Sequence, residues 1–324
     1  MLKLPHPRKI NFGIHEKSCN LSCSKCLVHS PDYPRGKKIL KTLDRMNIGN
    51  IVKIFDEIKS FKPTVSPSFW SEPLLNKRLF KNFVIEAKKR NIPVSKNTNA
   101  LLIDNSMAEF LVENLDTISV SIDAFTSKTL ELTRSTDELD QIKGAIQRLL
   151  DKRGGSNKPR IVVSFTVEDE NLHEKDVFLK YWIKRVDAVR INEAYDDCKK
   201  INTGSERETR EPCREIYDSM SVDFNGVARM CCLDAYRETN LGNVFKDGVL
   251  NVWNNNKFKK LRHSHEDSST AIDKFCEGCD QWAGFNIVEE YEKEGLLIRK
   301  TKFSSYYNRV DKLSNWKNSR LKTD

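Results

Sequence analysis

The chain has 324 residues, a formal net charge of +9 and nine cysteines. Its length allows two cores, so we expect one large domain and one small one. Residues 299–324 carry a net charge of +6 and the rest of the chain only +3. This distribution predicts a basic tail that is solvated or packed back on the protein. Because the rest of the chain is only mildly basic, we expect no nucleic-acid partner. The sequence lacks a signal-peptide pattern and any run of 18 apolar residues, so it predicts a cytoplasmic protein with no membrane span and with reduced, metal-binding cysteines.

Short apolar runs alternate with amphipathic helical stretches through the first 200 residues. This alternation is typical of βα units that build a parallel sheet. The predicted strands are residues 9–14, 64–69, 93–97, 117–122, 160–167 and 187–192, and the predicted helices are 47–61, 76–90, 106–114, 137–153 and 174–183. Six such units favour an α/β fold, a partial (β/α)6 parallel TIM-like barrel, whose reactive groups gather at the carboxyl ends of the strands.

Three cysteines, Cys19, Cys23 and Cys26, follow the first predicted strand at the spacing C-x3-C-x2-C. Structural zinc sites normally have four protein ligands, whereas a four-iron cluster held by three cysteines keeps one iron open. The motif resembles that of the radical SAM enzymes, in which the open iron binds S-adenosylmethionine. Lys25 stands where that family usually has an aromatic residue. The alternative interpretation is a chance group of buried or zinc-binding cysteines.

Two segments at later strand ends resemble cofactor-binding segments of the same family. Trp70-Ser71-Glu72-Pro73 stands where the family has Gly-Gly-Glu-Pro, and the resemblance implies that Glu72 holds the amino group of the cofactor. Asn99 lies in a segment that resembles the Thr-Asn-Gly loop of the family, with alanine in place of glycine. Read alone, a glutamate before a proline is equally typical of a solvated turn.

The ends of the fourth and sixth predicted strands add further candidates. The resemblance implies that Ser121 contacts the ribose of the cofactor, that Asp123 belongs to the same site, and that Arg134 pairs with the cofactor carboxylate. Ser121 and Asp123 could equally be strand-end caps. Glu193, at the end of the sixth strand, and Trp70 are candidate substrate contacts.

From about residue 211 the pattern changes to short strands, a glycine turn and cysteines. This part resembles the SPASM or Twitch extension of radical SAM enzymes, and Gly226 to Cys231 matches its Gly-x4-Cys spacing. The resemblance implies one auxiliary [4Fe–4S] cluster, with a four-cysteine zinc site as the alternative. The predicted ligands are Cys213, Cys231, Cys276 and Cys279. Cys232 is directed elsewhere along the strand, and we predict that it donates a hydrogen atom to the substrate, the alternative being a buried small hydrophobe.

The predicted organisation is a radical SAM core at 1–200, a SPASM/Twitch-like domain at 201–290 forming a small cysteine-rich α+β domain, and a basic tail at 291–324. The implied cofactors are S-adenosylmethionine, its [4Fe–4S] cluster and one auxiliary [4Fe–4S] cluster. The implied reaction starts with reductive cleavage of S-adenosylmethionine to a 5′-deoxyadenosyl radical, and the expected reducing partner is a flavodoxin or ferredoxin.

Three classes of function fit these motifs. We favour hydrogen abstraction from a small polar substrate, such as a sugar, aminocyclitol or nucleotide sugar, leading to epimerisation or dehydrogenation. Maturation of a ribosomally made peptide is the second, although such relatives often carry a leader-binding domain, for which we see no room ahead of Arg8. The third is a zinc- or cluster-stabilised nucleic-acid-binding module without enzymatic activity.

Overall fold

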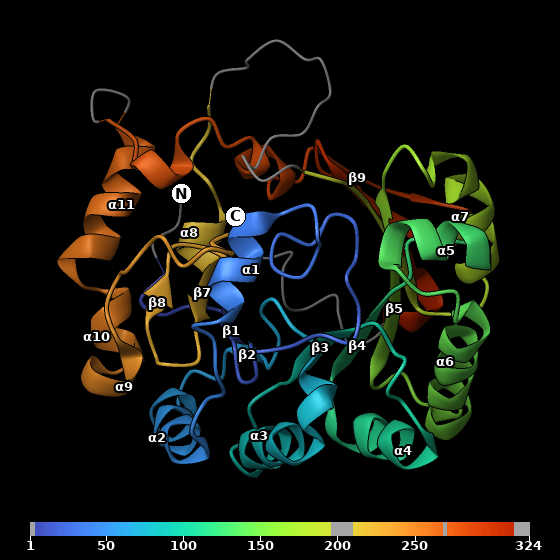
Figure 1. Cartoon of the computed structure of the whole chain (residues 1–324), viewed down its shortest axis with the longest axis horizontal. Helices are drawn as coiled ribbons and strands as arrows, with labels where there is room; N and C mark the ends of the chain where they lie inside the picture. Colours follow the sequence, from blue (N-terminus) through green and yellow to red (C-terminus); the bar gives the residue numbers. More distant parts are fainter. Residues whose placement is uncertain (1–3, 196–209, 268–270, 314–324) are drawn as a thin grey trace. The chain divides into compact units, whose positions relative to one another are not determined.

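The computed structural model describes residues 4–195, 210–267 and 271–313 (Figure 1). Its contacts divide the chain into two compact units, each built from two separate stretches of sequence. The first unit comprises Met1–Lys96 and Tyr195–Asn286, and the second comprises Asn97–Ala194 and Ile287–Asp324. Among the described residues, no helix is long and apolar enough to cross a membrane.

The six predicted strands and five predicted helices are all present. The strands are β1 (Lys9–Phe12), β2 (Thr64–Ser66), β3 (Ser95–Thr98), β4 (Thr117–Ser121), β5 (Arg160–Val167) and β6 (Ala188–Glu193). The helices are α2 (Ile48–Ile58), α3 (Lys77–Lys89), α4 (Asn105–Asn114), α6 (Leu139–Arg153) and α7 (Lys175–Trp182). Alternating parallel strands and helices are therefore confirmed.

The first unit holds a four-stranded sheet in the order β2-β1-β7-β8, where β7 is Ser219–Val222 and β8 is Ala228–Arg229. Both β2 and β7 run parallel to β1, so the chain after residue 210 joins the same sheet as the start of the sequence. Phe12, Phe55 and Phe83 pack edge to face, with ring centroids 5.0–6.0 Å apart, and tie α2 and α3 to this sheet.

Within its described residues, the first unit holds five further helices. They are α1 (Pro34–Leu40), α8 (Glu215–Asp218), α9 (Val244–Asp247), α10 (Val249–Trp253) and α11 (Asn256–Glu266). The side chain of Asn255 caps α11 by accepting a hydrogen bond from the Phe258 amide, and the apolar face of α11 is buried through Phe258 and Leu261. Trp253 and Phe258 both pack against the Arg262 guanidinium, whose pKa is lowered by burial to about 10.

The second unit holds most of a seven-stranded sheet in the order β3-β4-β5-β6-β11-β10-β9. The pairs β4–β5 and β5–β6 are parallel, as predicted. Helix α7 packs on β5 and β6, with Phe165 and Phe178 4.8 Å apart between ring centroids. An additional helix, α5 (Ser127–Arg134), follows β4.

The segment predicted as a basic tail is partly built into this sheet. Strands β9 (Glu289–Lys293), β10 (Leu296–Lys300) and β11 (Ser304–Arg309) form an antiparallel extension from β6. Arg299 forms an ion pair with Glu290, and Lys300 Nζ lies 2.9 Å from Glu289 Oε2. Acids of the neighbouring strand therefore neutralise part of the basic charge. Residues 314–324 lie outside the described part of the chain.

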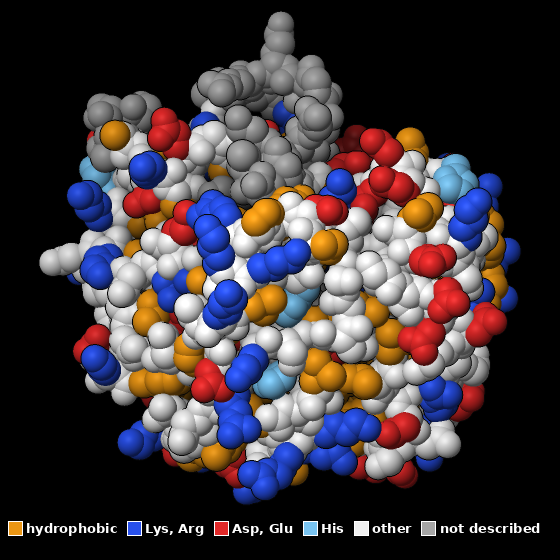
Figure 2. Space-filling view, viewed as in Figure 1, with side chains coloured by type: hydrophobic (Ala, Val, Ile, Leu, Met, Phe, Trp, Pro, Cys, Tyr) orange, Lys and Arg blue, Asp and Glu red, His pale blue; other side chains and the backbone are white. Residues whose placement is uncertain are grey.

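Short 3-10 helices complete the described structure at Pro73–Asn76, Leu172–Glu174, Lys274–Cys276, Gln281–Gly284 and Val310–Lys312. The face drawn in Figure 2 carries Lys and Arg as well as Asp and Glu side chains.

Candidate active site and cluster sites

Cys19, Cys23 and Cys26 lie in the loop that leaves the carboxyl end of β1. Burial, opposed by a hydrogen bond to the Leu21 backbone and reinforced by the neighbouring Cys23, Glu72 and Cys26, raises the pKa of the Cys19 thiol to about 12. The Cys26 amide donates to the Cys23 carbonyl over 3.0 Å, and the His29 amide donates to the Cys26 sulfur over 3.4 Å. The structure thus gathers the three thiols and Glu72, and iron binding here must displace the thiol protons.

Glu72 has a buried partner that sequence reasoning missed. Its Oε1 accepts hydrogen bonds from the Leu74 amide at 3.1 Å and from the Lys96 ammonium at 2.8 Å. Lys96, on β3, is 1% exposed, and its pKa is lowered by burial, with Glu72 and Cys19 opposing that shift. The only sequence signal was a lysine inside a short predicted strand. The carboxylate predicted to hold the cofactor amino group therefore already bonds one ammonium.

Trp70 brings an unused hydrogen-bond donor to the same unit. Its carbonyl oxygen accepts from His29 Nε2 at 2.8 Å, while its indole N–H is buried and has no acceptor among the described residues. Trp70 and Cys26 both pack against one apolar cluster, formed by Leu27, Val28, Leu43 and Ala235. A buried indole N–H usually finds a partner, so this donor suits a polar group of a bound molecule.

Asn99 and Ser121, in the second unit, make local contacts. The Asn99 side chain accepts from the Leu101 amide at 3.1 Å, and Ser121 Oγ lies 3.3 Å from Ser164 Oγ. Ala100, at the position of the family glycine, has φ of +67°. The loop thus keeps a left-handed backbone that glycine adopts without strain.

Asp123 and Arg134 form a buried ion pair within the second unit. Arg134 donates to Asp123 Oδ2 from Nε at 2.9 Å and from Nη2 at 2.6 Å, and the Thr166 amide donates to Asp123 Oδ1 at 2.6 Å. Sequence reasoning assigned the Arg134 guanidinium to the cofactor carboxylate. In this structure two of its donors are held by Asp123, which fixes the direction of the remaining part of the guanidinium.

Glu193 ends β6 and is exposed. It lines a cavity of about 200 Å³ together with Lys175 of α7, Phe303 and Tyr307. Its amide donates to the Phe303 carbonyl at 2.9 Å, which ties the end of β6 to the turn before β11. Its role as a substrate contact stays a prediction.

The four predicted auxiliary ligands come together in the first unit. Burial raises the pKa of Cys213, and among its charged neighbours Cys276 and Cys279 raise it further. Burial also raises the pKa of Cys231, with contributions from Cys232, Cys213 and Cys276. Mutual effects of this kind require the thiols to be close.

Cys231 and its neighbour Cys232 have different surroundings. Burial raises the pKa of the Cys232 thiol, and Glu215, to which it is hydrogen-bonded, raises it further, whereas Lys9 lowers it. Cys231 instead has Cys276 among its neighbours. Cys213 is a neighbour of both thiols, and Cys232 lies beside Glu215 and Lys9, where β1 begins. The choice of Cys231 as the cluster ligand stays a prediction.

Two polar side chains support the auxiliary site, and sequence reasoning missed both. Arg210 Nη1 donates to the carbonyls of Cys276 and Cys279, at 3.0 and 3.1 Å. The Cys213 amide donates to His265 Nδ1 at 3.3 Å, and burial, with help from Arg210, lowers the pKa of His265 to about 4. A neutral His265 is therefore an acceptor for the backbone of a ligand residue.

The donor sets fit iron–sulfur clusters. Within residues 4–195, 210–267 and 271–313, no three His, Cys, Asp or Glu side chains are spaced to hold a single metal ion. Thiolates are the usual ligands of iron–sulfur clusters. Three thiols beside Glu72 suit a cluster with an open iron, and four thiols suit a fully ligated one.

A family model described as the radical SAM superfamily matches residues 14–178, which is half of the chain. The chain belongs to the radical SAM superfamily. A second model, an iron–sulfur cluster-binding domain named SPASM, matches residues 213–280, the stretch that contains all four predicted auxiliary ligands. Radical SAM proteins with this domain bind S-adenosylmethionine at a [4Fe–4S] cluster and carry an auxiliary cluster, which confirms the predicted cofactors.

Solved structures show the same fold at low sequence identity. BtrN, solved with AdoMet and 2-DOIA, has a TM-score of 0.58 and 16% identity over 86% of this chain and 94% of its own. The protein anSMEcpe with bound AdoMet has a TM-score of 0.62 and 16% identity over 85% and 87%. Streptococcus suis SuiB, bound to precursor peptide SuiA, has a TM-score of 0.62 and 16% identity, over 80% of this chain and 67% of its own. No curated protein sequence matches the chain.

Proposed function

We propose that this radical SAM protein dehydrogenates a hydroxyl-bearing carbon of a small polar substrate, such as a sugar, aminocyclitol or nucleotide sugar. The observation that carries the proposal is the proximity of the assigned ligands, since Cys213 has Cys276 and Cys279 among its neighbours and Cys231 has Cys213 and Cys276. Four cysteine ligands complete a four-iron cluster, so this cluster suits electron transfer rather than substrate binding.

The cofactors supply the difficult chemistry and the chain supplies placement. When bound at Cys19, Cys23 and Cys26, the cluster with S-adenosylmethionine supplies a 5′-deoxyadenosyl radical that takes one hydrogen atom from the substrate. We assign to Glu72 the amino group of the cofactor, and the hydrogen bond from Lys96 holds the Glu72 carboxylate in place. The indole N–H of Trp70 is the donor we assign to a polar oxygen of the substrate or cofactor.

In the second unit we assign the cofactor carboxylate and ribose to Arg134 and Ser121. Asp123 positions Arg134, since it accepts two of the guanidinium donors. Asn99 shapes the neighbouring loop by accepting from the Leu101 amide. Glu193 is the proposed substrate contact of this unit, next to Lys175.

A dehydrogenation removes two hydrogens and balances as follows. One hydrogen atom goes to deoxyadenosine, the hydroxyl proton goes to solvent or a base, and one electron leaves for an acceptor, for which the auxiliary cluster is suited. A precedent for a small substrate is BtrN, a structural neighbour that was solved with 2-DOIA.

Epimerisation is the second candidate, and it depends on Cys232. A thiol that faces the substrate returns a hydrogen atom to the carbon radical. Cys232 contacts Glu215 near the first residue of β1, whereas the Cys19–Cys26 loop follows the opposite end of β1. This contact counts against a role of the Cys232 thiol at the reactive cluster. Peptide maturation, for which SuiB and its peptide SuiA are a precedent, is the third candidate.

One experiment separates these candidates. The iron-loaded protein is reduced anaerobically with S-adenosylmethionine in deuterium oxide, with a panel of sugars, aminocyclitols and nucleotide sugars, and the products are analysed by mass spectrometry. Dehydrogenation gives a product lighter by two hydrogens, with no deuterium at carbon. Epimerisation would instead give a product that keeps all atoms of the substrate except that one carbon-bound hydrogen is replaced by deuterium from the solvent. The Cys232→Ser variant would not form this product.

A further inference from the structure

One face of the seven-stranded sheet carries a row of polar side chains that crosses strands β4, β5, β6, β11 and β10. Residues that pair directly across neighbouring strands point to the same face of a sheet. The register pairs Ser121 with Ser164, Ser164 with Arg190, Arg190 with Tyr306, and Tyr306 with Arg299, all within the second unit. Phe165, the next residue of β5, packs on α7, so the row lies on the face away from that helix.

Arg190, in the middle of this row, has no acidic partner among the described residues. Its Nε is buried and makes no hydrogen bond within residues 4–195, 210–267 and 271–313. Arg299, two strands away, differs because it forms an ion pair with Glu290. The neighbours of Arg190 on its own face are all uncharged: Ser164 and Tyr306 across the strands, and Ala188 and Asn192 along β6. The described chain therefore supplies a cation here without a matching anion.

The side chains around Arg190 hold its guanidinium in place and add a donor. Its guanidinium carbon lies 5.1 Å from the centroid of the Tyr306 ring, a cation–π contact. The amide oxygen of Asn192 accepts from Ser304 Oγ at 3.0 Å, which leaves the amide NH2 group as a donor on the same face. A planar guanidinium binds a carboxylate or a phosphate through two parallel hydrogen bonds.

The row also connects Arg190 to the residue assigned above to the cofactor ribose. Ser121 stands in the same row, two strands from Arg190. Neighbouring strands lie about 4.8 Å apart, so the two Cα atoms are separated by about 10 Å. A sugar ring with one attached phosphate or carboxylate can cover such a distance.

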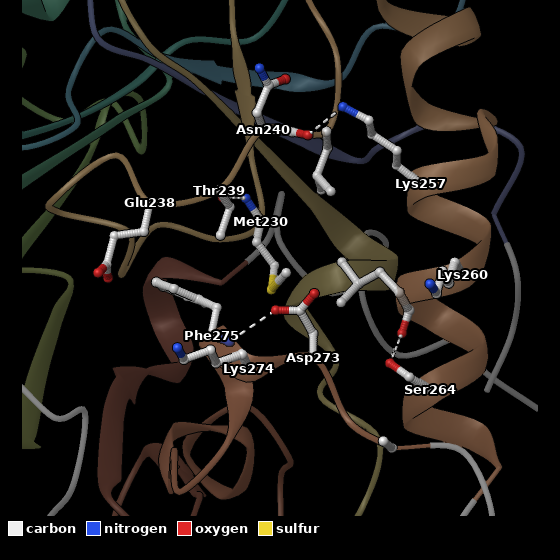
Figure 3. A pocket seen from close by; sticks show the side chains of 13 residues that line it. Met230, Glu238, Thr239, Asn240, Lys257, Lys260, Ser264, Asp273, Lys274 and Phe275 are labelled. Carbon is white, nitrogen blue, oxygen red and sulfur yellow. Dashed lines mark hydrogen bonds between the residues drawn. The ribbon is translucent and has the colours of Figure 1, made fainter.

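The lysines beside α11 do not select an anion in this way. Figure 3 shows a cavity of about 610 Å³ in the first unit, whose wall includes the lysines Lys257, Lys260 and Lys274 together with the acids Asp273 and Glu238. The three lysines are exposed, so water already stabilises their charges. A buried donor without an acceptor, as in Arg190, is the stronger indication of a missing anion.

We propose that Arg190, stacked on Tyr306 and flanked by Asn192, binds an anionic group of the substrate, either a phosphate or a carboxylate. The inference rests on the proposed function and narrows its substrate class. Of the candidate substrates, this site selects sugars that carry such a group, including nucleotide sugars, over neutral sugars and over aminocyclitols, whose ammonium groups Arg190 repels.

The test is isothermal titration of the iron-loaded full-length protein, without oxygen and with S-adenosylmethionine present. The probes are glucose 1-phosphate, uridine diphosphate glucose, glucuronate, glucose and 2-deoxystreptamine. At least one anionic probe should bind the wild type roughly tenfold or more tightly than glucose does. Preference for the phosphates or for glucuronate identifies which anionic group the site takes.

Two substitutions of Arg190 separate its charge from its shape. In Arg190→Gln the preferred anionic probe should bind roughly 10- to 100-fold more weakly, the range for hydrogen bonds to a charged group. Arg190→Lys should keep part of the preference, because it keeps the charge and loses the planar fork. The affinity for S-adenosylmethionine and the iron content should match those of the wild type in both variants.

Arg185→Gln is the matched control. Arg185 also lies over a tyrosine ring, with its guanidinium carbon 3.7 Å from the centroid of Tyr181, but it is exposed in the turn after α7. Its substitution makes the same change in net charge as Arg190→Gln. Because exposed charges are screened by salt, the control should bind the anionic probe within about twofold of the wild type.

Several results would overturn the site. They are equal wild-type affinities for anionic and neutral probes, no binding of any anionic probe, and equal losses in Arg190→Gln and Arg185→Gln. A loss of affinity for S-adenosylmethionine alone in Arg190→Gln would make Arg190 a cofactor ligand instead. If Arg190→Gln does not load iron, the wild-type ranking and Arg190→Lys decide.

Failure of the proposed function looks different. If anion binding depends on Arg190 and no probe loses two hydrogens, the dehydrogenation is wrong and the anion site stands. If a neutral substrate is dehydrogenated equally fast by the wild type and by Arg190→Gln, the dehydrogenation stands and the anion site is wrong.

Discussion

Lys96 is a cation with no exposed side-chain surface, a rare situation unless the charge is paired. Its partner is Glu72, at 2.8 Å, and both side chains lie beside Cys19. Burying two charges costs free energy, which their attraction and the hydrogen bonds around them repay only while both partners are present. The pair therefore fixes the position of the Glu72 carboxylate next to the cysteine loop.

Replacing Lys96 by Met should lower the free energy of unfolding by about 3–5 kcal/mol, because it leaves the Glu72 carboxylate buried without its ammonium. The measurement is anaerobic urea unfolding followed by tryptophan fluorescence. Lys89→Met is the control, since Lys89 pairs with Glu86 at 2.7 Å but is 62% exposed, and such pairs contribute about 0–1 kcal/mol. Equal decreases in the free energy of unfolding of the two variants would show that the buried pair contributes no more stability than the exposed one.

Trp70→Phe removes the unpaired indole N–H and keeps an aromatic ring. If this donor binds a ligand oxygen, the affinity for either S-adenosylmethionine or the substrate should fall by about 0.5–1.5 kcal/mol, roughly 2- to 13-fold. Isothermal titration with each ligand measures both affinities, and unchanged iron content shows that the Cys26 loop is intact. Two affinities equal to those of the wild type would remove Trp70 from the site.

At the scale of elements, Glu174 anchors the start of α5, the helix that ends in Arg134. Its carboxylate accepts from Thr126 Oγ1 at 2.6 Å, from Thr129 Oγ1 at 2.9 Å and from the amides of Phe125 and Thr126. Burial alone raises the pKa of Glu174, but these hydrogen bonds outweigh it and lower the pKa below 4.5. Glu174 thus sets the position of the Asp123–Arg134 pair through α5.

A lowered carboxyl pKa means that the folded state favours the ionised form. The stabilisation is complete above the ordinary pKa of 4.5 and is lost as the pH falls through the lower folded-state pKa. We expect Glu174→Gln to lower the free energy of unfolding by about 1.5–3 kcal/mol at pH 7. As the pH falls below 4.5, the free energy of unfolding should decrease less in Glu174→Gln than in the wild type. Urea unfolding at several pH values tests this, with the exposed Glu170→Gln as control; parallel pH curves for wild type and Glu174→Gln would contradict it.

The strands and helices of the βα units were predictable because each buries an apolar stripe with the period of its own structure, as Ile51, Ile54, Phe55 and Ile58 do on α2. The cysteine positions were predictable because ligand spacing is local in sequence. Partners such as Lys96, Arg210 and Glu174 were not, because a polar residue that is paired in the interior has no periodic signature. Strands β10 and β11 were missed for a related reason: their basic residues suggested a tail, whereas pairing with β6 and β9 decides their structure.

At the scale of the whole molecule, the two cluster sites use separate sets of cysteines. Replacing Cys19, Cys23 and Cys26 together by Ala should leave about half of the iron, on a stoichiometry of about eight irons for two four-iron clusters. Replacing Cys213, Cys231, Cys276 and Cys279 should remove the other half. Iron and zinc analysis of anaerobically purified proteins measures both, and a wild-type protein with zinc and no iron would refute the cluster assignment.

The most direct test of the central claim is formation of 5′-deoxyadenosine from S-adenosylmethionine by the reduced, iron-loaded protein, quantified by mass spectrometry without oxygen. Wild-type protein should form it, and the Cys19→Ala/Cys23→Ala/Cys26→Ala variant, with its auxiliary iron retained, should form none. Equal deoxyadenosine from both proteins would contradict the assignment of these three cysteines, and none from fully loaded wild-type protein would contradict the proposed enzymatic activity itself.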